Sequence, residues 1–311
     1  MSHRGFKELG QTYLAIVNPA AGGGRSGKLL GPALKRLRDA GIEVKVATTH
    51  APGQATEIAR DAYTRGVRHF IAFGGDGTSY EIVNGLFPQA IGKEPPTLGF
   101  LPLGTGNSFL RDFSDRGVEY AIESLCAVQS RPVDVMRMRH RTGEIYFINL
   151  LSMGFSADVA ALRARRFSHW GELGYFISIF LTLARFNRRP FPTRVEGQNQ
   201  FDDRRCLFVT FNNSKFTGGT MMIAPKAQVD DGLVEYVRWG PIGRFGLLRN
   251  LPGLYDGTHI QHPLAERKAV QRVEFKLDAP VDVMVDGEVL SLQCEEMTVL
   301  PKALNVVVKL P

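Results

Sequence analysis

The first part of the chain, up to about residue 134, alternates short apolar runs with stretches of helical periodicity. Apolar runs of this length, bounded by turn residues, are typical of buried strands. The helical patterns cover residues 28–40 and 55–65, and each ends at a glycine, Gly41 or Gly66. This alternation predicts a parallel, doubly wound α/β sheet. The predicted strands are residues 13–17, 43–48, 69–73 and 97–102.

After about residue 134 the pattern changes to strand-like runs in which apolar and polar residues alternate. Such runs, separated by turn residues, predict a mainly antiparallel β domain. We therefore expect an α/β domain over residues 1–134 and a mainly antiparallel β domain over 135–300, interrupted by a helical insertion at 157–189. The tail, residues 301–311, is expected to pack back on the first domain. The predicted strands after residue 134 are residues 206–212, 233–239, 273–277, 281–285, 297–300 and 306–310.

Turns with small or polar residues follow all four predicted strands of the first domain. Residues 18–27 follow the first strand, Thr49 the second, 74–78 the third and 104–107 the fourth. Ligands of doubly wound sheets bind beyond the carboxyl ends of the strands. Glycines there allow backbone N–H groups to approach a ligand, and helix N-termini favour anions. The pattern therefore predicts a phosphate-binding edge.

The turn at residues 74–78 reads Gly-Gly-Asp-Gly-Thr and leads into a helical pattern over 79–86. An aspartate facing a phosphate requires a divalent cation or a transferable proton between them. Asp76 therefore indicates a nucleotide phosphate together with a metal. The alternative is a strand–turn–helix corner with a capping aspartate, and the motif alone leaves both interpretations open.

Composition narrows the class of protein. The 311 residues are 44% hydrophobic and 22% charged, which fits a soluble globular protein of two domains. Cys126, Cys206 and Cys294 form neither a metal spacing nor a disulfide framework, so a reducing compartment is expected. The N-terminus lacks the apolar core of a signal peptide, and no stretch reaches the roughly 18 apolar residues that span a bilayer. We expect a cytoplasmic protein.

The positive charge is concentrated in one segment. Residues 159–194 contain seven arginines and one glutamate, and so carry six of the seven net positive charges. The same segment holds the most apolar run of the chain, residues 173–184. A basic, aromatic-rich apolar helix suits an anionic membrane surface. A core helix with solvated arginines at its ends is the open alternative. No nucleic-acid motif accompanies the charge, so nucleic acid is not an expected partner.

Ordered motifs along almost the whole chain resemble the diacylglycerol kinase catalytic-domain family, which includes bacterial lipid kinases and the sphingosine kinases. The resemblance implies an ATP-binding α/β domain similar to that of NAD kinase and phosphofructokinase, and a β-sandwich that carries a lipid pocket. The motifs are Asn18-Pro-Ala-Ala-Gly-Gly-Gly, Gly74-Gly-Asp-Gly-Thr-Ser-Tyr-Glu-Ile-Val-Asn-Gly-Leu, Leu101-Pro-Leu-Gly-Thr-Gly-Asn, Met153-Gly-Phe-Ser-Ala-Asp-Val, Ala224-Pro-Lys-Ala-Gln-Val-Asp-Asp-Gly-Leu and Val285-Asp-Gly-Glu.

The same resemblance implies the catalytic and ATP-binding residues. Asp286 matches the proton acceptor of bacterial members, and Asp76 the residue given that role in sphingosine kinases, so either could be the base. Asp286-Gly-Glu is also a strong signal for a tight hairpin turn. The implied ATP-binding residues are Asn18, Pro19, Ala20, Ala21, Gly22, Thr49, Gly74, Gly75, Asp76, Gly77, Thr78, Glu81, Gly104, Thr105, Gly106, Asn107, Gly287 and Glu288.

A structural Mg²⁺ site is implied at Asp231, with the backbone carbonyls of Gln228 and Leu233. Oxygen ligands in a loop suit a hard cation, although aspartates before a glycine are also common turn residues. Asp158 is the implied substrate-binding residue. Asp134 lies at the expected domain junction, either in the metal–water network or as a hinge or cap.

The chain departs from the family at two positions. Ser108 stands where bacterial members have an aspartate of the metal network, although Asp112 follows four residues later. Ala160 replaces the aspartate with which sphingosine kinases read an amine. An amine-bearing lipid is therefore disfavoured.

We thus expect an ATP- and Mg²⁺-dependent kinase that phosphorylates the hydroxyl of a diacylglycerol-like lipid at an anionic membrane surface. The alternatives are a sphingosine or long-chain-base kinase and a soluble-substrate kinase such as an NAD kinase. A homodimer is left open.

Overall fold

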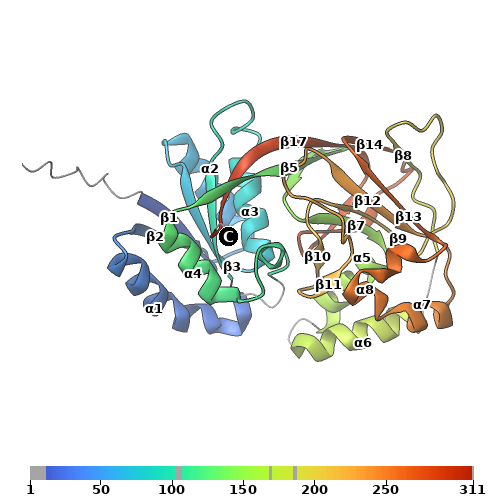
Figure 1. Cartoon of the computed structure of the whole chain (residues 1–311), viewed down its shortest axis with the longest axis horizontal. Coiled ribbons are helices and arrows are strands. Elements are labelled where there is room, and N and C mark those ends of the chain that lie inside the picture. The colour runs from blue at the N-terminus through green and yellow to red at the C-terminus, as the bar shows by residue number, and fades with distance from the viewer. Residues whose placement is uncertain (1–11, 103–106, 168–169, 185–187, 310–311) are drawn as a thin grey trace, which may run out of the picture. The chain divides into compact units, whose positions relative to one another are not determined.

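The structure is a computed structural model, and it describes residues 12–102, 107–167, 170–184 and 188–309 (Figure 1). The chain divides into two compact units. The first unit comprises residues 1–104, 113–131 and 304–311, and the second comprises 105–112 and 132–303. Residues 105–112, which the sequence-based boundary assigned to the first domain, therefore cluster with the second unit.

The first unit is built on a parallel sheet whose strands are ordered β2-β1-β3-β4-β17. Phe70, Ile71 and Leu98 are fully buried in its core, as expected for strands covered on both faces. The last residues of β17 extend this sheet, because Asn305 and Val306 pair with β4. The strands are β1 (Thr12–Val17), β2 (Glu43–Thr48), β3 (His69–Gly74), β4 (Thr97–Pro102) and the end of β17 (Cys294–Val307).

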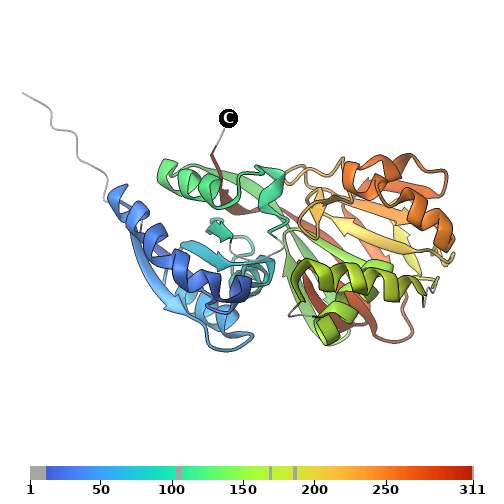
Figure 2. The same ribbon diagram turned by 90° about the horizontal axis from the view of Figure 1, so that it is seen from below.

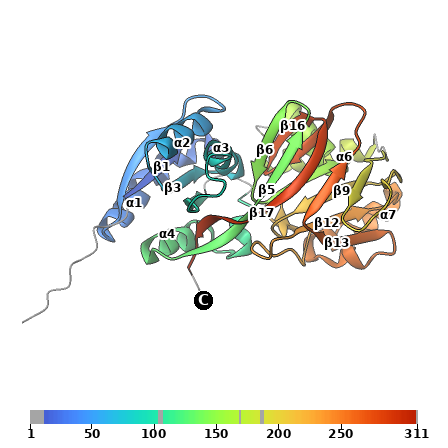
Figure 3. The same ribbon diagram turned by 90° about the horizontal axis from the view of Figure 1, so that it is seen from above.

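Helices cover this sheet in two pairs. α2 packs on α3, and α1 packs on α4. Figure 3 shows the two pairs on opposite sides of the strands, which confirms the doubly wound α/β fold. The helices are α1 (Arg25–Asp39), α2 (Gln54–Thr64), α3 (Asp76–Leu86) and α4 (Gly117–Ala127).

The contact between α2 and α3 depends on one glycine. A Cβ atom on Gly85 would lie 2.4 Å from the carbonyl oxygen of Thr56 and 2.7 Å from Cβ of Ala59. These distances are far below normal van der Waals separations, so α3 reaches this position only because residue 85 has no side chain. The contact fixes the direction of α3, whose first residue is Asp76.

The second unit contains a six-stranded antiparallel sheet, ordered β13-β12-β9-β7-β15-β16. Its strands are β7 (Leu150–Gly154), β9 (Phe208–Asn212), β12 (Val234–Trp239), β13 (Ala265–Val270), β15 (Val281–Val285) and β16 (Glu288–Leu292).

A second antiparallel layer faces this sheet. β14 pairs with β17 and β8, and β5 pairs with β6 and β17 (Figure 1). Phe211 of the six-stranded sheet and Phe275 of β14 stack edge to face across the two layers, with ring centroids 5.1 Å apart. The expected β-sandwich is therefore confirmed. The further strands are β5 (Ser130–His140), β6 (Gly143–Phe147), β8 (Thr193–Val195), β10 (Phe216–Thr217), β11 (Met221–Met222) and β14 (Arg272–Phe275).

Short helices pack against the six-stranded sheet around Trp239 and Phe208. Ile179 of α6, Leu247 of α7 and Leu254 of α8 contribute to this buried cluster. Within the described residues, none of the helices is both long and apolar enough to cross a membrane. The helices are α5 (Phe155–Leu162), a π-helical turn (Arg163–Phe167), α6 (Gly171–Ala184), α7 (Arg244–Asn250) and α8 (Gly253–Asp256).

Candidate functional site

The turns predicted to bind phosphate begin at one edge of the first unit's sheet. Val17 pairs with Thr48 on one side and with Phe73 on the other, and Gly74 pairs with Pro102. The turns that follow β1, β2, β3 and β4 therefore start side by side. Of the fourth turn, Gly104, Thr105 and Gly106 lie outside the described residues, and Asn107 is described with a φ of +22°.

The first two turns are tied to the strand ends by their own polar groups. The N–H of Asn18 donates to the Phe73 carbonyl (3.0 Å), and its Oδ1 accepts from the N–H of Ala20 (3.0 Å). Thr49 is buried and donates both its N–H and its hydroxyl to the carbonyl of Val17. The side chains of Asn18 and Thr49 thus shape the two loops.

The turn at residues 74–78 leaves no room for a side chain at its first position. A Cβ on Gly74 would lie 2.2 Å from Oγ1 of Thr78, which is buried in the first turn of α3. Asp76 is the first residue of that helix, and the Ser79 hydroxyl donates to its carbonyl (2.8 Å). A carboxylate in the first turn is favoured by the partial positive charge of a helix N-terminus. Asp76 is therefore an acidic group held at the edge where the four turns begin.

Glu81 makes contacts that its sequence position did not reveal. Its Oε1 accepts from the N–H of Gly53 (2.9 Å) and its Oε2 from the N–H of Ala55 (3.0 Å). Because Gly53 has no side chain to cap α2, Glu81 supplies the missing acceptors from the neighbouring helix. Both carboxylate oxygens thus stabilise the start of α2, whereas the resemblance assigned this residue to ATP.

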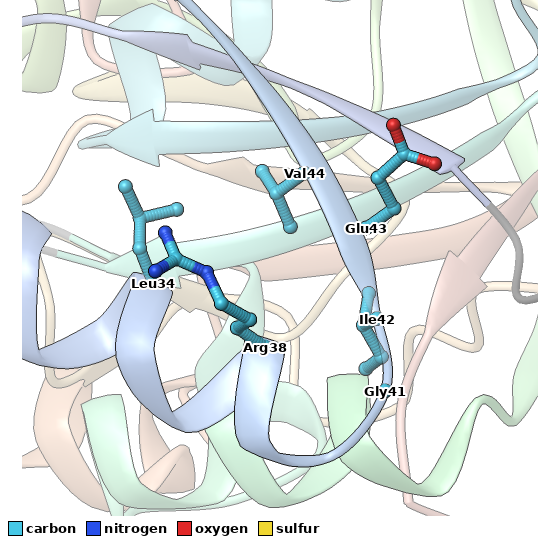
Figure 4. Close-up of a pocket in the computed structure, with 6 residues that line it drawn as sticks. All are labelled: Leu34, Arg38, Gly41, Ile42, Glu43 and Val44. Carbon is cyan, nitrogen blue, oxygen red and sulfur yellow. The ribbon is translucent and has the colours of Figure 1, made fainter.

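A separate hollow lies at the opposite end of these strands (Figure 4). It is lined by Leu34 and Arg38 of α1 and by residues 41–44, which lead into β2. Residues that precede a strand lie at its amino end, while the phosphate-compatible turns follow the carboxyl ends. The hollow in Figure 4 is therefore not part of the candidate nucleotide site.

In the second unit, Asp286 and Gly287 form the two-residue turn between β15 and β16. Both have positive φ angles, +46° and +88°, and Val285 pairs with Glu288 across the turn. Asp-Gly is favoured in such hairpins because both central residues take left-handed conformations. The motif therefore forms the tight hairpin that its sequence indicated. Asp286 also makes contacts outside this turn.

The carboxylate of Asp286 is buried and accepts three backbone hydrogen bonds. Its Oδ2 accepts from the N–H of Ile148 (3.0 Å), and its Oδ1 from those of Asn149 (3.1 Å) and Leu150 (2.9 Å). Hydrogen bonds from N–H groups to a carboxylate are among the stronger ones in proteins. They fix the orientation of Asp286 relative to the chain segment that enters β7.

Buried polar side chains surround this segment, and the sequence analysis missed them. Asn213 donates through Nδ2 to the carbonyls of Ile148 (2.8 Å) and Asp134 (3.0 Å), and the Ser214 hydroxyl donates to Oδ1 of Asn149. The available signal was the polar run Asn212-Asn213-Ser214 directly after an apolar strand pattern. This network joins Asp286 to Asp134 within the second unit.

Asp134 is fully buried, and its carboxylate holds two backbone segments together instead of facing solvent where a metal could bind. Its carboxylate accepts from the N–H groups of Gly232 and Lys302, both at 2.7 Å. Burial raises the pKa of Asp134, and these two hydrogen bonds act in the opposite direction. Asp134 thus fixes the loop that contains Asp231 from behind.

The predicted Mg²⁺ site lies in this loop. Asp231 is exposed, and its Oδ1 accepts from the N–H of Leu233 (3.0 Å). An aspartate side chain that accepts from the N–H two residues later forms an Asx-turn. The described residues contain no group of three histidine, cysteine or acidic side chains that could hold a metal. A cation at this loop would therefore rely on Asp231 and on carbonyls such as those of Gln228 and Leu233. Such an all-oxygen set is compatible with Mg²⁺.

The segment after the fourth turn belongs to the second unit. The Ser108 hydroxyl accepts from the N–H of Gly219 (3.0 Å), and Oδ1 of Asp112 accepts from the N–H of Lys215 (3.1 Å). Both side chains thus hold the loop around β10. Ser108 replaces the aspartate of bacterial family members, and its hydroxyl accepts a hydrogen bond as a carboxylate would.

Asp158, the predicted substrate-binding residue, forms an ion pair with Arg189 at 2.6 Å. Both side chains are partly buried. Burial raises the pKa of Asp158, and the adjacent guanidinium of Arg189 counteracts this. The charge of Asp158 is thus largely matched inside the protein.

An apolar pocket lies in the second unit between the six-stranded sheet and the helices. Its cavity volume is about 50 Å³, within about 500 Å³ of atom-free space that includes open solvent. The hydroxyl oxygens of Ser152 and Ser156 are buried at this pocket and have no hydrogen-bond partner among the described residues. The pocket is lined by Leu150, Ser152, Phe155, Ser156, Val159, Ile179, Phe208, Thr210, Thr217, Met221, Ile223, Leu251, Leu254 and Met284.

Comparison with known protein families assigns both halves of the chain. Residues 12–138 match the model of the diacylglycerol kinase catalytic domain. Residues 149–308 match that of the YegS C-terminal NAD kinase beta sandwich-like domain. The chain belongs to the diacylglycerol kinase and YegS family of lipid kinases. This confirms the resemblance drawn from the motifs, and a kinase of this family uses ATP.

Individual relatives agree with this assignment over most of their length. A protein of Chromohalobacter salexigens named "Probable lipid kinase YegS-like" is 31% identical to this chain. The match covers 90% of this chain and 87% of the relative's length. The diacylglycerol kinase of Bacillus subtilis is 29% identical, over 92% and 95%. The crystal structure of a diacylglycerol kinase from Bacillus anthracis superposes with a TM-score of 0.72, at 21% identity, over 97% of this chain and 98% of that one.

Proposed function

We propose that this lipid kinase transfers the γ-phosphate of ATP to the hydroxyl of a diacylglycerol-like lipid and forms a phosphatidic-acid-type product. The observation that supports this most directly is the apolar pocket of the second unit. Its walls suit an acyl chain, and the unpartnered hydroxyls of Ser152 and Ser156 suit the ester or hydroxyl oxygens of a glycerolipid. A buried hydroxyl without a partner costs about 1–3 kcal/mol, which a bound lipid would recover.

The charges near the pocket favour a neutral lipid over a sphingoid base. Reading a cationic amine requires a carboxylate, and the acidic side chain that α5 offers, Asp158, is already paired with Arg189. Ala160, at the position where sphingosine kinases have a second aspartate, has no carboxylate to offer instead. An amine bound here would therefore compete with an arginine for the same carboxylate.

The chemistry requires ATP to be positioned and the lipid hydroxyl to lose its proton. We assign phosphate binding to the turns at residues 18–22, 74–78 and 104–107, with Asp76 at the start of α3. Mg²⁺ bound with ATP would neutralise phosphate charge, and Asp76 is the acidic residue best placed to hold it. Asp286 would accept the proton of the lipid hydroxyl while the new oxygen–phosphorus bond forms and the bond to ADP breaks.

Radiolabelled ATP tests the substrate class. The intact protein is incubated with mixed micelles that contain diacylglycerol, sphingosine or neither, and with NAD in detergent alone. We expect label in the diacylglycerol product. Transfer to sphingosine in preference to diacylglycerol would reject the neutral-lipid assignment, and transfer to NAD without transfer to lipid would reject lipid kinase activity altogether.

A matched pair of variants tests the role of Asp286. Asp286→Asn should lower transfer by about 100-fold or more, the typical contribution of a general base. Asp278→Asn makes the same chemical change at an exposed position and should leave transfer unchanged. Equal activity of the two variants would refute the proposed role of Asp286.

A further inference from the structure

Two helices of the second unit expose large apolar side chains on their outer surface. Phe245 in the first turn of α7 is 88% exposed, and Phe180 of α6 is 59% exposed. Leu181 and Leu248 on the same helices are also exposed. We call these four residues the α6–α7 face. A single exposed leucine needs no explanation, but several large side chains gathered on adjacent helices indicate an interaction surface.

The two helices form one continuous surface. The guanidinium of Arg244, the first residue of α7, donates to the carbonyl of Ala184 at the end of α6 (2.9 Å). In Figure 1 both helices lie along the lower edge of the second unit, and Figure 2 views that edge from below with both in front. Their inner residues Ile179, Leu183 and Leu247 belong to one buried cluster. The exposed residues therefore occupy the opposite, outward side of the same helices.

Exposed arginines lie on α7 and on the segments next to α6 and α7. Arg244 and Arg249 flank Phe245 and Leu248 on α7, and Arg188 donates to the carbonyl of Pro241 just before that helix (3.1 Å). Arg166 is exposed in the π-helical turn that packs against α6. Apolar side chains flanked by arginines match a bilayer that presents anionic head groups over hydrocarbon. A second copy of the chain is a poorer match, because a two-fold contact would oppose arginine to arginine.

The pocket lies directly behind this surface. Ile179 lines the pocket and the next residue, Phe180, points outward; Leu251 and Leu254, which follow α7, also line it. The helices that expose the apolar residues thus also form part of the pocket wall. A lipid could move from a bilayer at the α6–α7 face to the pocket without crossing water.

We propose that the α6–α7 face docks on anionic bilayers, with Phe180 and Phe245 inserted as anchors, and that lipid enters the pocket from this side. The second clause rests on the proposed lipid kinase function, whereas docking itself does not require transfer. Burial of a phenylalanine side chain changes binding by about tenfold to a hundredfold. Removal of both anchors should therefore weaken docking by more than tenfold.

Co-sedimentation with vesicles tests the docking. Wild-type protein should bind vesicles of phosphatidylglycerol and phosphatidylcholine and bind pure phosphatidylcholine far less. Phe180→Ser with Phe245→Ser should lower binding to the anionic vesicles by more than tenfold. Arg166→Glu with Arg249→Glu should lower it as well. Ile91→Ser, a matched change at an exposed apolar residue of the first unit, should have no effect. Unchanged binding of the double serine variant would overturn the proposal.

Two further measurements separate the outcomes. Sedimentation velocity without lipid should give the same species for wild type and the double serine variant; a wild-type dimer that the variant dissociates would make this face a subunit interface and overturn the proposal. With a short-chain diacylglycerol dispersed below its micellar concentration, the variant should keep wild-type transfer. If wild type binds anionic vesicles but phosphorylates no lipid, the proposed function fails while docking stands.

Discussion

Asp286 shows how one residue can be both a turn former and a buried acceptor. Its carboxylate receives three backbone N–H groups, and in Asp286→Asn one of its two oxygens becomes an NH₂ donor that faces them. Leaving buried groups unsatisfied typically costs about 1–3 kcal/mol. We therefore expect Asp286→Asn to lower the free energy of unfolding by that amount, measured in urea, in addition to its loss of transfer. Asp278→Asn should unfold like wild type; equal stability of both variants would contradict this role of the carboxylate.

His259 gives a prediction for pH dependence. The ring is buried, with Nδ1 3.0 Å from the carbonyl of Gly253 and Nε2 3.0 Å from that of Ile223. Burial lowers the pKa of His259, and although the two facing carbonyls act in the opposite direction, the folded protein binds the proton less readily than the unfolded chain. Its contribution to stability is therefore complete above the unfolded pKa of about 6.5 and is lost as the pH falls through the folded pKa.

Thermal unfolding of wild type and His259→Gln between pH 8 and pH 5 measures this effect. Glutamine does not titrate, so the difference in stability between the two proteins should shrink as the pH is lowered. His69 and His140 also have lowered pKa values, but they are common to both proteins and cancel in the difference. A difference that stays constant over this range would exclude titration of His259.

The sequence was sufficient to pick out the acidic residues of the candidate site, but it did not show what their side chains contact. Asp76 and Asp286 were found because each lies in a short motif of glycines. The capping of α2 by Glu81 and the ion pair of Asp158 with Arg189 join residues 26 to 31 positions apart. Such contacts depend on how helices pack, and no local pattern encodes them. The unpartnered hydroxyls of Ser152 and Ser156 were missed for the same reason.

At the scale of elements, the packing of α2 on α3 is the most sensitive point. In Gly85→Ala the new methyl group would collide with the Thr56 carbonyl, which is backbone and cannot rotate away. Forcing an extra methyl group into a packed contact costs about 1–3 kcal/mol. We expect Gly85→Ala to lose that much stability in urea unfolding and to lower transfer, because α3 begins at Asp76. Arg60→Ala, on the exposed side of α2, should change stability by less than about 0.5 kcal/mol.

Most strands of the first unit were predicted to within one residue, since long apolar runs between glycines leave little choice. The predicted residues 13–17 and 69–73 correspond to β1 (Thr12–Val17) and β3 (His69–Gly74). The last two predicted strands, 297–300 and 306–310, are instead parts of one strand, β17 (Cys294–Val307). Pro301 lies between the two predicted runs, and the next residue, Lys302, takes a φ of +52° and donates its N–H to buried Asp134.

On the scale of the whole molecule, the first unit is not one continuous piece of chain. Leu304, Val306, Val307 and Val308 are buried in it, although they follow the entire second unit in sequence. Local patterns cannot show that the chain returns in this way. The segment also pairs with β4, which would otherwise be the edge strand of the sheet.

A fragment of residues 12–138, the part that matches the catalytic-domain model, should therefore fail to fold. Truncating a single buried leucine typically costs about 2–5 kcal/mol, and domains are stable by only about 5–15 kcal/mol, so losing four buried side chains removes most of that margin. Joining residues 302–309 to the fragment through a flexible linker should restore cooperative unfolding. The linker needs about a dozen residues or more, because the added strand must run parallel to β4. Circular dichroism during heating distinguishes the two chains. A cooperative transition in the unextended fragment would show that the first unit does not need its C-terminal strand. No transition in the extended one would show that the missing stability comes from elsewhere than β17.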